Sequence, residues 1–133
     1  MKAVFADTSY YLALLSESDA RHEQAVCFSR SNLAPIVLTD FILLELGNAM
    51  HSRASRGMFV GLLRHLRSDP TCMIVPVSKP LFEAGLQLYT QRPDKDWSLT
   101  DCTSFAVMRH HRLTDALSAD RHFEQAGFKV LLK

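Results

Sequence analysis

Short apolar runs alternate with longer amphipathic stretches along the chain, and this alternation constrains the fold more than any other feature. The apolar runs predict strands at residues 3–6, 35–38, 72–75, 116–118 and 128–132. The stretches around them predict helices at about 9–15, 19–30, 40–55, 59–68, 79–89, 100–111 and 120–126. Strands separated by helices indicate a three-layer α/β/α fold with a central, mainly parallel sheet of four to five strands.

Residues that cap or end helices support these borders. Thr39-Asp40 and Thr100-Asp101 have N-cap chemistry ahead of apolar stretches. Gly127 lies where a helix should stop, and Asp69-Pro70 ends the helix before the third strand. Because no repeat or flexible linker interrupts the chain, we expect residues 1–133 to form a single domain.

The composition excludes several classes of protein. The net charge of +1 is too small for a general polyelectrolyte clamp, so any nucleic-acid affinity needs local clusters of charge. Three cysteines without a C-x-x-C pair favour reduced thiols in a cytoplasm over a disulfide framework or a zinc site. No apolar run approaches the length of a signal-peptide core or a membrane span, so we expect a cytoplasmic protein that does not enter a membrane.

Three acidic residues lie at expected strand ends or helix starts. Asp7 follows the first strand, Asp101 begins the helix at 100–111, and Asp120 follows the fourth strand. Ligands of parallel α/β sheets bind at the carboxyl ends of the strands, so these carboxylates are placed for chemistry. Each also has a structural explanation, because a carboxylate in the first turn caps a helix and favours its dipole. Their positions alone leave both interpretations open.

Glu45 projects from a largely apolar helical stripe. Of its four neighbours at helical spacing, Phe41, Ile42 and Ala49 are apolar. A glutamate is seldom buried unless it is paired or bound to a metal, and the alternative is a side chain that reaches water from the edge of the stripe. If the fold brings Glu45 together with the other three acids, a cation must compensate their charge. Oxygen ligands would favour Mg²⁺ or Mn²⁺ over zinc.

The four acids lie in four motifs, in this order along the chain: DTS at 7–9, LLELGNA at 43–49, SLTDC at 98–102 and SADRHF at 118–123. Together these motifs resemble the PIN domain family, and more narrowly the VapC-type toxin ribonucleases of VapBC toxin–antitoxin pairs. The resemblance implies a Mg²⁺- or Mn²⁺-dependent endoribonuclease that hydrolyses RNA phosphodiester bonds. It also implies that the acids serve as catalytic residues and metal ligands: Asp7, Glu45, Asp101 and Asp120.

Supporting residues follow from the same resemblance. Thr8 or Ser9 matches the hydroxyl that steadies the first aspartate or a metal-bound water, and Ser118 matches the hydroxyl two residues before the last acid. Asp96 is a possible peripheral ligand, although a solvated charged loop that includes Asp94 is the simpler interpretation. None of the histidines pairs at i, i+4 with another ligand, so we expect no metal role for them.

An acidic site repels RNA, so we expect cations to flank it. The segment 51–67 carries no acidic residue, and an exposed helix face is the alternative explanation of its charge. The expected RNA-binding residues are Arg53, Arg56, Arg64, Arg67 and Arg121. Apolar residues around Tyr10-Tyr11 and 59–63 exceed what a small core needs. We expect most of them to belong to the core, and by the resemblance some would form a homodimer face or a groove for an antitoxin segment.

Two other functions fit the sequence less well. A non-catalytic RNA-binding protein with a PIN-like fold would have no need of the complete set of four acids. A phosphoryl-transfer domain of the receiver or phosphatase type requires a paired acid or an Asp-x-Asp at the first strand, where this chain has Asp7-Thr8-Ser9.

Overall fold

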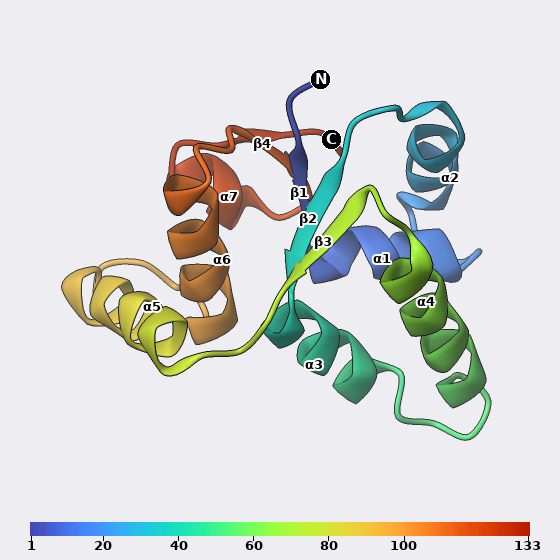
Figure 1. Ribbon diagram of the computed structural model, residues 1–133, viewed down its shortest axis with the longest axis horizontal. Coiled ribbons are helices and arrows are strands. Elements are labelled where there is room, and N and C mark those ends of the chain that lie inside the picture. The colour runs from blue at the N-terminus through green and yellow to red at the C-terminus, as the bar shows by residue number, and fades with distance from the viewer.

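The computed structural model describes residues 1–133 and contains one five-stranded sheet (Figure 1). Its strands are β1 (Val4–Ala6), β2 (Ile36–Thr39), β3 (Cys72–Val75), β4 (Asp115–Leu117) and β5 (Lys129–Val130). They lie in the order β3-β2-β1-β4-β5, and all neighbouring strands are parallel. The expected α/β fold with a parallel sheet is therefore confirmed.

This strand order has a consequence for ligand binding. The chain builds outward from β1 through β2 to β3, and then returns to the other side of β1 for β4 and β5. The strand order thus reverses between β1 and β4, and in parallel sheets ligands bind beyond the carboxyl ends of the strands at such a point. Two of the sequence motifs, at Asp7 and at Ser118, directly follow these two strands.

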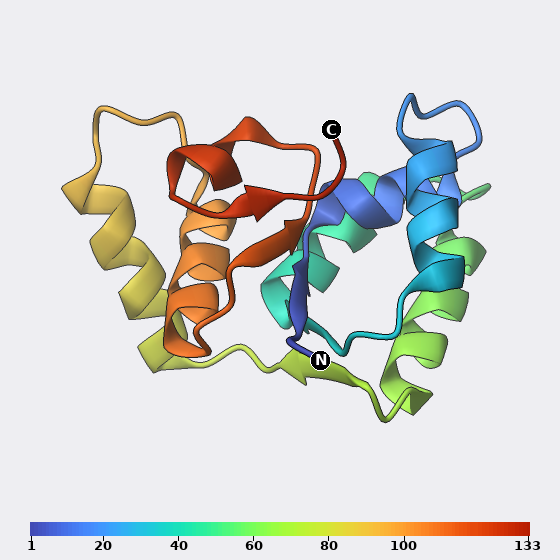
Figure 2. The same ribbon diagram turned by 90° about the horizontal axis from the view of Figure 1, so that it is seen from above.

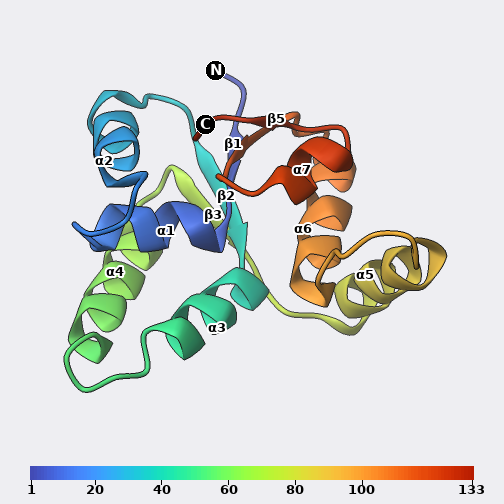
Figure 3. The same cartoon turned by 180° about the vertical axis from the view of Figure 1, so that it is seen from behind.

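Seven helices surround the sheet, and Figures 1 and 3 show α1, α2 and α4 on one side and α5, α6 and α7 on the other. Their bounds are α1 (Thr8–Leu15), α2 (His22–Ser31), α3 (Asp40–Ala49), α4 (Arg56–Ser68), α5 (Lys79–Gln91), α6 (Leu99–His110) and α7 (Arg121–Gln125). Figure 2 shows α5 as the outermost helix on its side, packed on α6 and away from the sheet. Every helix is too short or too polar to cross a lipid bilayer.

The expected end of one helix and the expected cap of another were wrong. The helix expected at 40–55 ends at Ala49, and α4 begins at Arg56. The hydroxyls of Ser52 and Ser55 lie 2.6 Å apart, and such side chains compete with the backbone for hydrogen bonds and favour a turn. The N-cap of α6 is Ser98, whose hydroxyl accepts from the Asp101 amide, and not Thr100 as expected. The Thr39 cap is confirmed, because its hydroxyl accepts from the Ile42 amide.

A cluster of aromatic side chains joins α6 to α7, the helices that carry the last two of the four sequence motifs. Phe105 of α6 and Phe123 of α7 are fully buried, with ring centroids 5.0 Å apart. The Trp97 ring packs edge-on against Phe105 at 5.1 Å, and its indole N–H donates to the Gln125 side chain at 3.0 Å. This packing holds the starts of α6 and α7 near one another, at the edge of the sheet where β1 and β4 end.

Candidate active site

Asp7 directly follows β1, and its carboxylate bonds to a residue beyond β4 instead of capping a helix. Its Oδ2 accepts hydrogen bonds from the hydroxyls of Ser9 and Ser118, both at 2.9 Å. Asp7 occupies the N-cap position of α1, but its side chain makes no capping hydrogen bond. The capping interpretation of this residue is therefore wrong. Ser118 lies just beyond β4, so the hydrogen bonds join the ends of two neighbouring strands.

Asp101 and Asp120 do cap helices, and they also face the same site. Asp101 forms a reciprocal capping box with Ser98, accepting from the Ser98 amide at 3.1 Å. Asp120 caps α7 by accepting from the His122 amide at 2.9 Å. The Asp120 amide in turn donates to the Ser118 hydroxyl, which bonds Asp7. The capping interpretation of these two acids is therefore confirmed, and it does not exclude the chemical one, because both also line the acidic cavity.

Glu45 is half-buried on α3 and forms no hydrogen bond or salt bridge. It lines a cavity of about 320 Å³ together with the other three acids. No lysine or arginine lines this cavity. The structure thus brings four carboxylates from four distant parts of the chain to one place, and no lysine or arginine lies between them.

Two aspartates close in sequence to Asp101 were expected to be either loop residues or a peripheral ligand: Asp94 and Asp96. Asp96 lines the cavity, as expected of a peripheral ligand, and brings the number of carboxylates around it to five. Asp94 points away and is held by Arg92 in a two-pronged ion pair at 3.0 Å. The solvated-loop interpretation fits Asp94, and Asp96 is an exposed loop residue that also faces the acids, so its role as a peripheral ligand stays a prediction.

Burial raises the pKa of two carboxyl groups of the site. Desolvation raises the pKa of Asp7 from 3.8 to about 6, and the Asp101 charge adds to this, against the hydrogen bonds from Ser118 and Ser9. Desolvation also raises the pKa of Asp101, with a further contribution from Asp120. A cation in the cavity would relieve both effects, because it favours the ionised carboxylates.

His122 belongs to this site, although no metal role was expected for the histidines. Its Nδ1 lies 3.1 Å from Asp101 Oδ2 and 3.3 Å from Asp120 Oδ1, and it lines the cavity. A nitrogen that bonds carboxylate oxygens must carry the proton, so here the ring acts as a donor that positions two acids. Spacing of i, i+4 to another ligand, the criterion applied to the histidines, does not detect this contact; the useful signal was a histidine two residues after a capping aspartate.

The donor set fits a hard divalent cation. Carboxylate oxygens dominate the cavity, and one oxygen of Asp101 lies within 4.8 Å of one oxygen of Asp120. Thr8 also lines the cavity, and its hydroxyl is buried without any hydrogen-bond partner, which calls for an explanation such as a bound water. Such oxygen-rich sets suit Mg²⁺ or Mn²⁺.

The arginines expected to bind RNA lie elsewhere. None of them lines the acidic cavity, and all are exposed on α4, on the turn before it, or at the start of α7: Arg53, Arg56, Arg64, Arg67 and Arg121. The Arg56 Nε donates to the His51 carbonyl at 2.6 Å. Arg121 directly follows Asp120 and is the nearest of the five in sequence to a site residue. Their role in RNA binding stays a prediction.

The fold and the acidic cavity define the class of protein. The PIN domain family matches residues 4–129, and the chain belongs to this family. The receiver and phosphatase alternatives are therefore wrong.

Among individual relatives, the chain is similar to the 23S rRNA-specific endonuclease VapC20 of Mycobacterium tuberculosis. The two are 28% identical over 125 residues, which cover 94% of this chain and 95% of the relative, in both strain CDC 1551 and strain H37Rv. The resemblance to VapC-type toxins is thereby confirmed.

Solved structures agree with this assignment. The crystal structure of M. tuberculosis VapC20, described as a Sarcin-Ricin loop cleaving toxin, matches with a TM-score of 0.85 and 27% identity, covering 94% of this chain and 95% of that one. FitAcB from Neisseria gonorrhoeae matches with a TM-score of 0.69 and covers 96% of this chain and 95% of its own, but at 18% identity it supports the fold alone.

Proposed function

We propose that this protein is a metal-dependent endoribonuclease and the toxin of a toxin–antitoxin pair. The observation that carries the proposal is the cavity at the β1–β4 switch point, which five carboxylates surround and no lysine or arginine lines. Membership of the PIN family and similarity to a named endonuclease toxin over nearly the whole chain support it.

Each acid has a proposed task. Asp7 and Asp101 are the most buried of the quartet, and we assign them as direct ligands of Mg²⁺ or Mn²⁺. Glu45 and Asp120 would hold waters bound to that ion or a second ion, and one of them would orient the attacking water. The bound ion would lower the pKa of its water and polarise a phosphoryl oxygen. Ser9 and Ser118 keep the Asp7 carboxylate in place through their hydroxyls.

The substrate class follows from the relatives. VapC20 is named for 23S rRNA, and its structure is described as that of a Sarcin-Ricin loop cleaving toxin. We infer that this chain also cleaves unpaired nucleotides in a structured RNA, with a ribosomal RNA loop as the first substrate to test. Such a substrate, together with three unpaired cysteines, is consistent with action in the cytoplasm.

The test is cleavage of a synthetic ribosomal RNA stem-loop, followed on a sequencing gel. We expect cleavage with Mg²⁺ or Mn²⁺, loss of cleavage in excess EDTA, and a loss of at least about a hundredfold in Asp101→Asn. The matched control is Glu83→Gln, which changes an exposed carboxylate of α5 outside the cavity and should cut like the wild type. Binding of the RNA without cleavage under any metal condition would instead establish the non-catalytic alternative.

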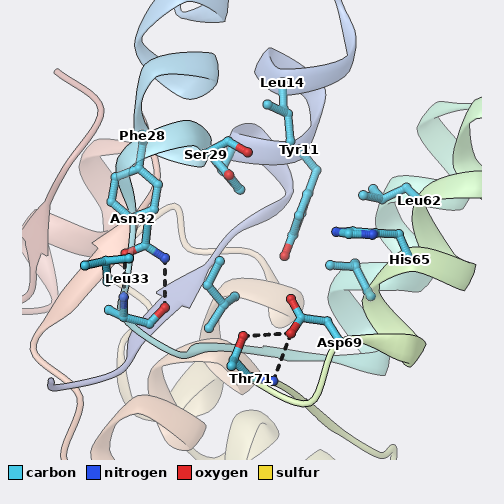
Figure 4. A pocket seen from close by; sticks show the side chains of 14 residues that line it. Tyr11, Leu14, Phe28, Ser29, Asn32, Leu33, Leu62, His65, Asp69 and Thr71 are labelled. Atoms are coloured by element: carbon cyan, nitrogen blue, oxygen red, sulfur yellow. Dashed lines mark hydrogen bonds between the residues drawn. The ribbon is translucent and has the colours of Figure 1, made fainter.

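A second cavity supports an antitoxin partner. It has a volume of about 330 Å³ and lies between α1, α2 and α4, lined mostly by apolar side chains that include Tyr10, Tyr11, Leu14 and Leu62 (Figure 4). The Tyr11 hydroxyl points into the space beside His65 and Asp69 and has no hydrogen-bond partner. We propose that a helical antitoxin segment binds here. Leu14→Asp should prevent inhibition by a co-expressed antitoxin and leave RNA cleavage intact.

A homodimer is the remaining partner prediction. Leu44, Met58 and Val60 expose between 43% and 61% of their surface on α3 and α4, which is unusual for large apolar side chains in a monomer. Analytical ultracentrifugation should give twice the mass of 15.0 kDa, and Met58→Lys with Val60→Lys should return the monomer mass.

A further inference from the structure

A third cavity adjoins the acidic one and has been given no role. It has a volume of about 590 Å³ and lies between the end of α5 and the loop that leads to α6. Asp96 lines both cavities, so the two share a wall. Pockets that hold small ligands are commonly about 300–1,000 Å³, so this one has room for a nucleotide unit.

The side chains of this cavity are the types that hold an unpaired nucleotide. The Tyr89 ring is 49% exposed, and the Arg92 guanidinium is 41% exposed. Unstacked bases bind on aromatic rings and on the flat face of arginine, and the stacking tolerates any base sequence. Lys95 also lines the cavity and forms no salt bridge, so its ammonium group is available to a phosphate.

The cavity is rigid where a base would rest. Trp97 is 4% exposed, and its indole is held by Phe105 and by the hydrogen bond to Gln125. The Arg92 guanidinium carbon lies 5.2 Å from the centre of the Trp97 ring, and Asp94 fixes the other side of the group. A planar cation that is already held in place loses little side-chain entropy when a base stacks on it.

This cavity places positively charged side chains beside the acidic cavity, which by itself repels RNA. The acidic cavity has no lysine or arginine to attract a phosphate chain, and none of the arginines expected to bind RNA lines either cavity. Arg92 and Lys95 are the cations that lie directly beside it across Asp96. Because Asp94 neutralises Arg92, Lys95 supplies the unpaired positive charge.

We propose that this cavity, formed by Tyr89, Arg92 and Lys95 on the shared wall of Asp96, is a subsite for one nucleotide of the RNA strand that flanks the scissile phosphate. The base stacks on Tyr89 and Arg92, and the phosphate pairs with Lys95. The inference rests on the proposed ribonuclease function and adds the place where the strand leaves the catalytic cavity.

The first test measures binding of a fluorescein-labelled single-stranded RNA oligonucleotide by anisotropy. Asp101→Asn serves as background, to prevent cleavage in the presence of Mg²⁺. Adding Tyr89→Ala should raise Kd by about five- to a hundredfold, the range typical of one lost base stack, whereas Tyr89→Phe should bind as the background does. The control is Phe82→Ala, which removes a ring of 37% exposure from the same helix outside this cavity and should leave Kd unchanged.

The phosphate contact is tested through salt. Lys95→Gln should make the slope of log Kd against log salt concentration shallower by about 0.7, the value for one phosphate of a single strand. Lys79→Gln removes an equal charge from the start of α5, which lies outside the cavity, and should leave the slope unchanged.

An abasic scan then identifies the nucleotide. Oligonucleotides that lack one base at a time near the cleavage site are compared on the background and on the Tyr89→Ala protein. At one position the two losses should fail to add, because ring and base belong to the same contact. Additive losses at every position, or wild-type Kd in both the Tyr89 and Lys95 variants, would overturn the subsite.

RNA cleavage by protein that retains Asp101 distinguishes failure of this inference from failure of the proposed function. Normal cleavage with no effect of the Tyr89 and Lys95 variants would overturn the subsite and leave the ribonuclease standing. Binding that depends on Tyr89 without cleavage by the wild type would support the subsite and overturn the ribonuclease.

Discussion

Asp7 should make the stability of the metal-free protein fall as the pH rises. The residue is 5% exposed, and burial raises the pKa of its carboxyl group from 3.8 to about 6. The folded protein therefore keeps a proton that the unfolded chain has already lost between these two values, so the free energy of unfolding decreases across this window. The difference in pKa corresponds to about 3 kcal/mol in total, of which about 2 kcal/mol falls between about pH 4.5 and about pH 7.5.

Asp7→Asn removes this titration and keeps the size of the side chain, so the comparison isolates one group. In urea unfolding with EDTA, the variant should gain about 2 kcal/mol relative to the wild type when the pH is raised from about 4.5 to about 7.5. Saturating Mg²⁺ at the higher pH should reverse the order, because only the wild type has the full ligand set.

Asp94→Asn is the matched control for the pH experiment. Its hydrogen bond to Arg92 lowers the pKa of this exposed carboxyl to about 2, so it stays ionised at both pH values. Its stability relative to wild type should therefore be the same at both. If Asp7→Asn also shows a constant difference, the Asp7 carboxyl is ionised throughout the window and the reasoning from burial is refuted.

Three further predictions concern other parts of the molecule. Gly85→Ala would place a Cβ 2.5 Å from a side-chain carbon and 3.1 Å from backbone atoms of α6, so it should destabilise by about 1–3 kcal/mol in thermal unfolding, whereas Gly61→Ala meets nothing within 4 Å and should be neutral or stabilising. His122→Gln should weaken Mn²⁺ binding by about ten- to a hundredfold in calorimetric titration, as loss of a partner that positions ligands usually does, and an unchanged affinity would leave His122 without that role. Arg64→Ala should weaken RNA binding with a shallower salt dependence, and an unchanged slope would move the RNA away from α4.

Local patterns in the sequence were good guides to the elements. The fully buried Val4–Ala6 strand, the Thr39 cap and the turn at Gly127, whose φ is +96°, each follow from side chains that lie next to one another in the chain. The expected end of α3 was wrong because Ser52 and Ser55 bond to each other. The helical spacing of apolar residues carries no information about such a hydrogen bond.

The acidic quartet was identified from strand ends, from one glutamate in an apolar stripe, and from a family resemblance. The structure added the contacts between residues, which those signals do not contain. Asp7 does not cap a helix because the Ser118 hydroxyl, 111 positions away, bonds its carboxylate. Asp96 and Asp94 are two residues apart, yet one lines the site and the other pairs with Arg92.

By itself, the sequence determined which segments are strands or helices, where most of them begin and end, and which acids lie at the strand ends. These properties depend on hydrophobic period and on hydrogen bonds between near neighbours, which any short segment already contains. Only the tertiary structure decided that β4 lies beside β1, that His122 joins Asp101 and Asp120, and that a second cavity shares Asp96 with the first. Those arrangements arise from burial of apolar faces between segments remote in the chain, and no local pattern specifies which faces will meet.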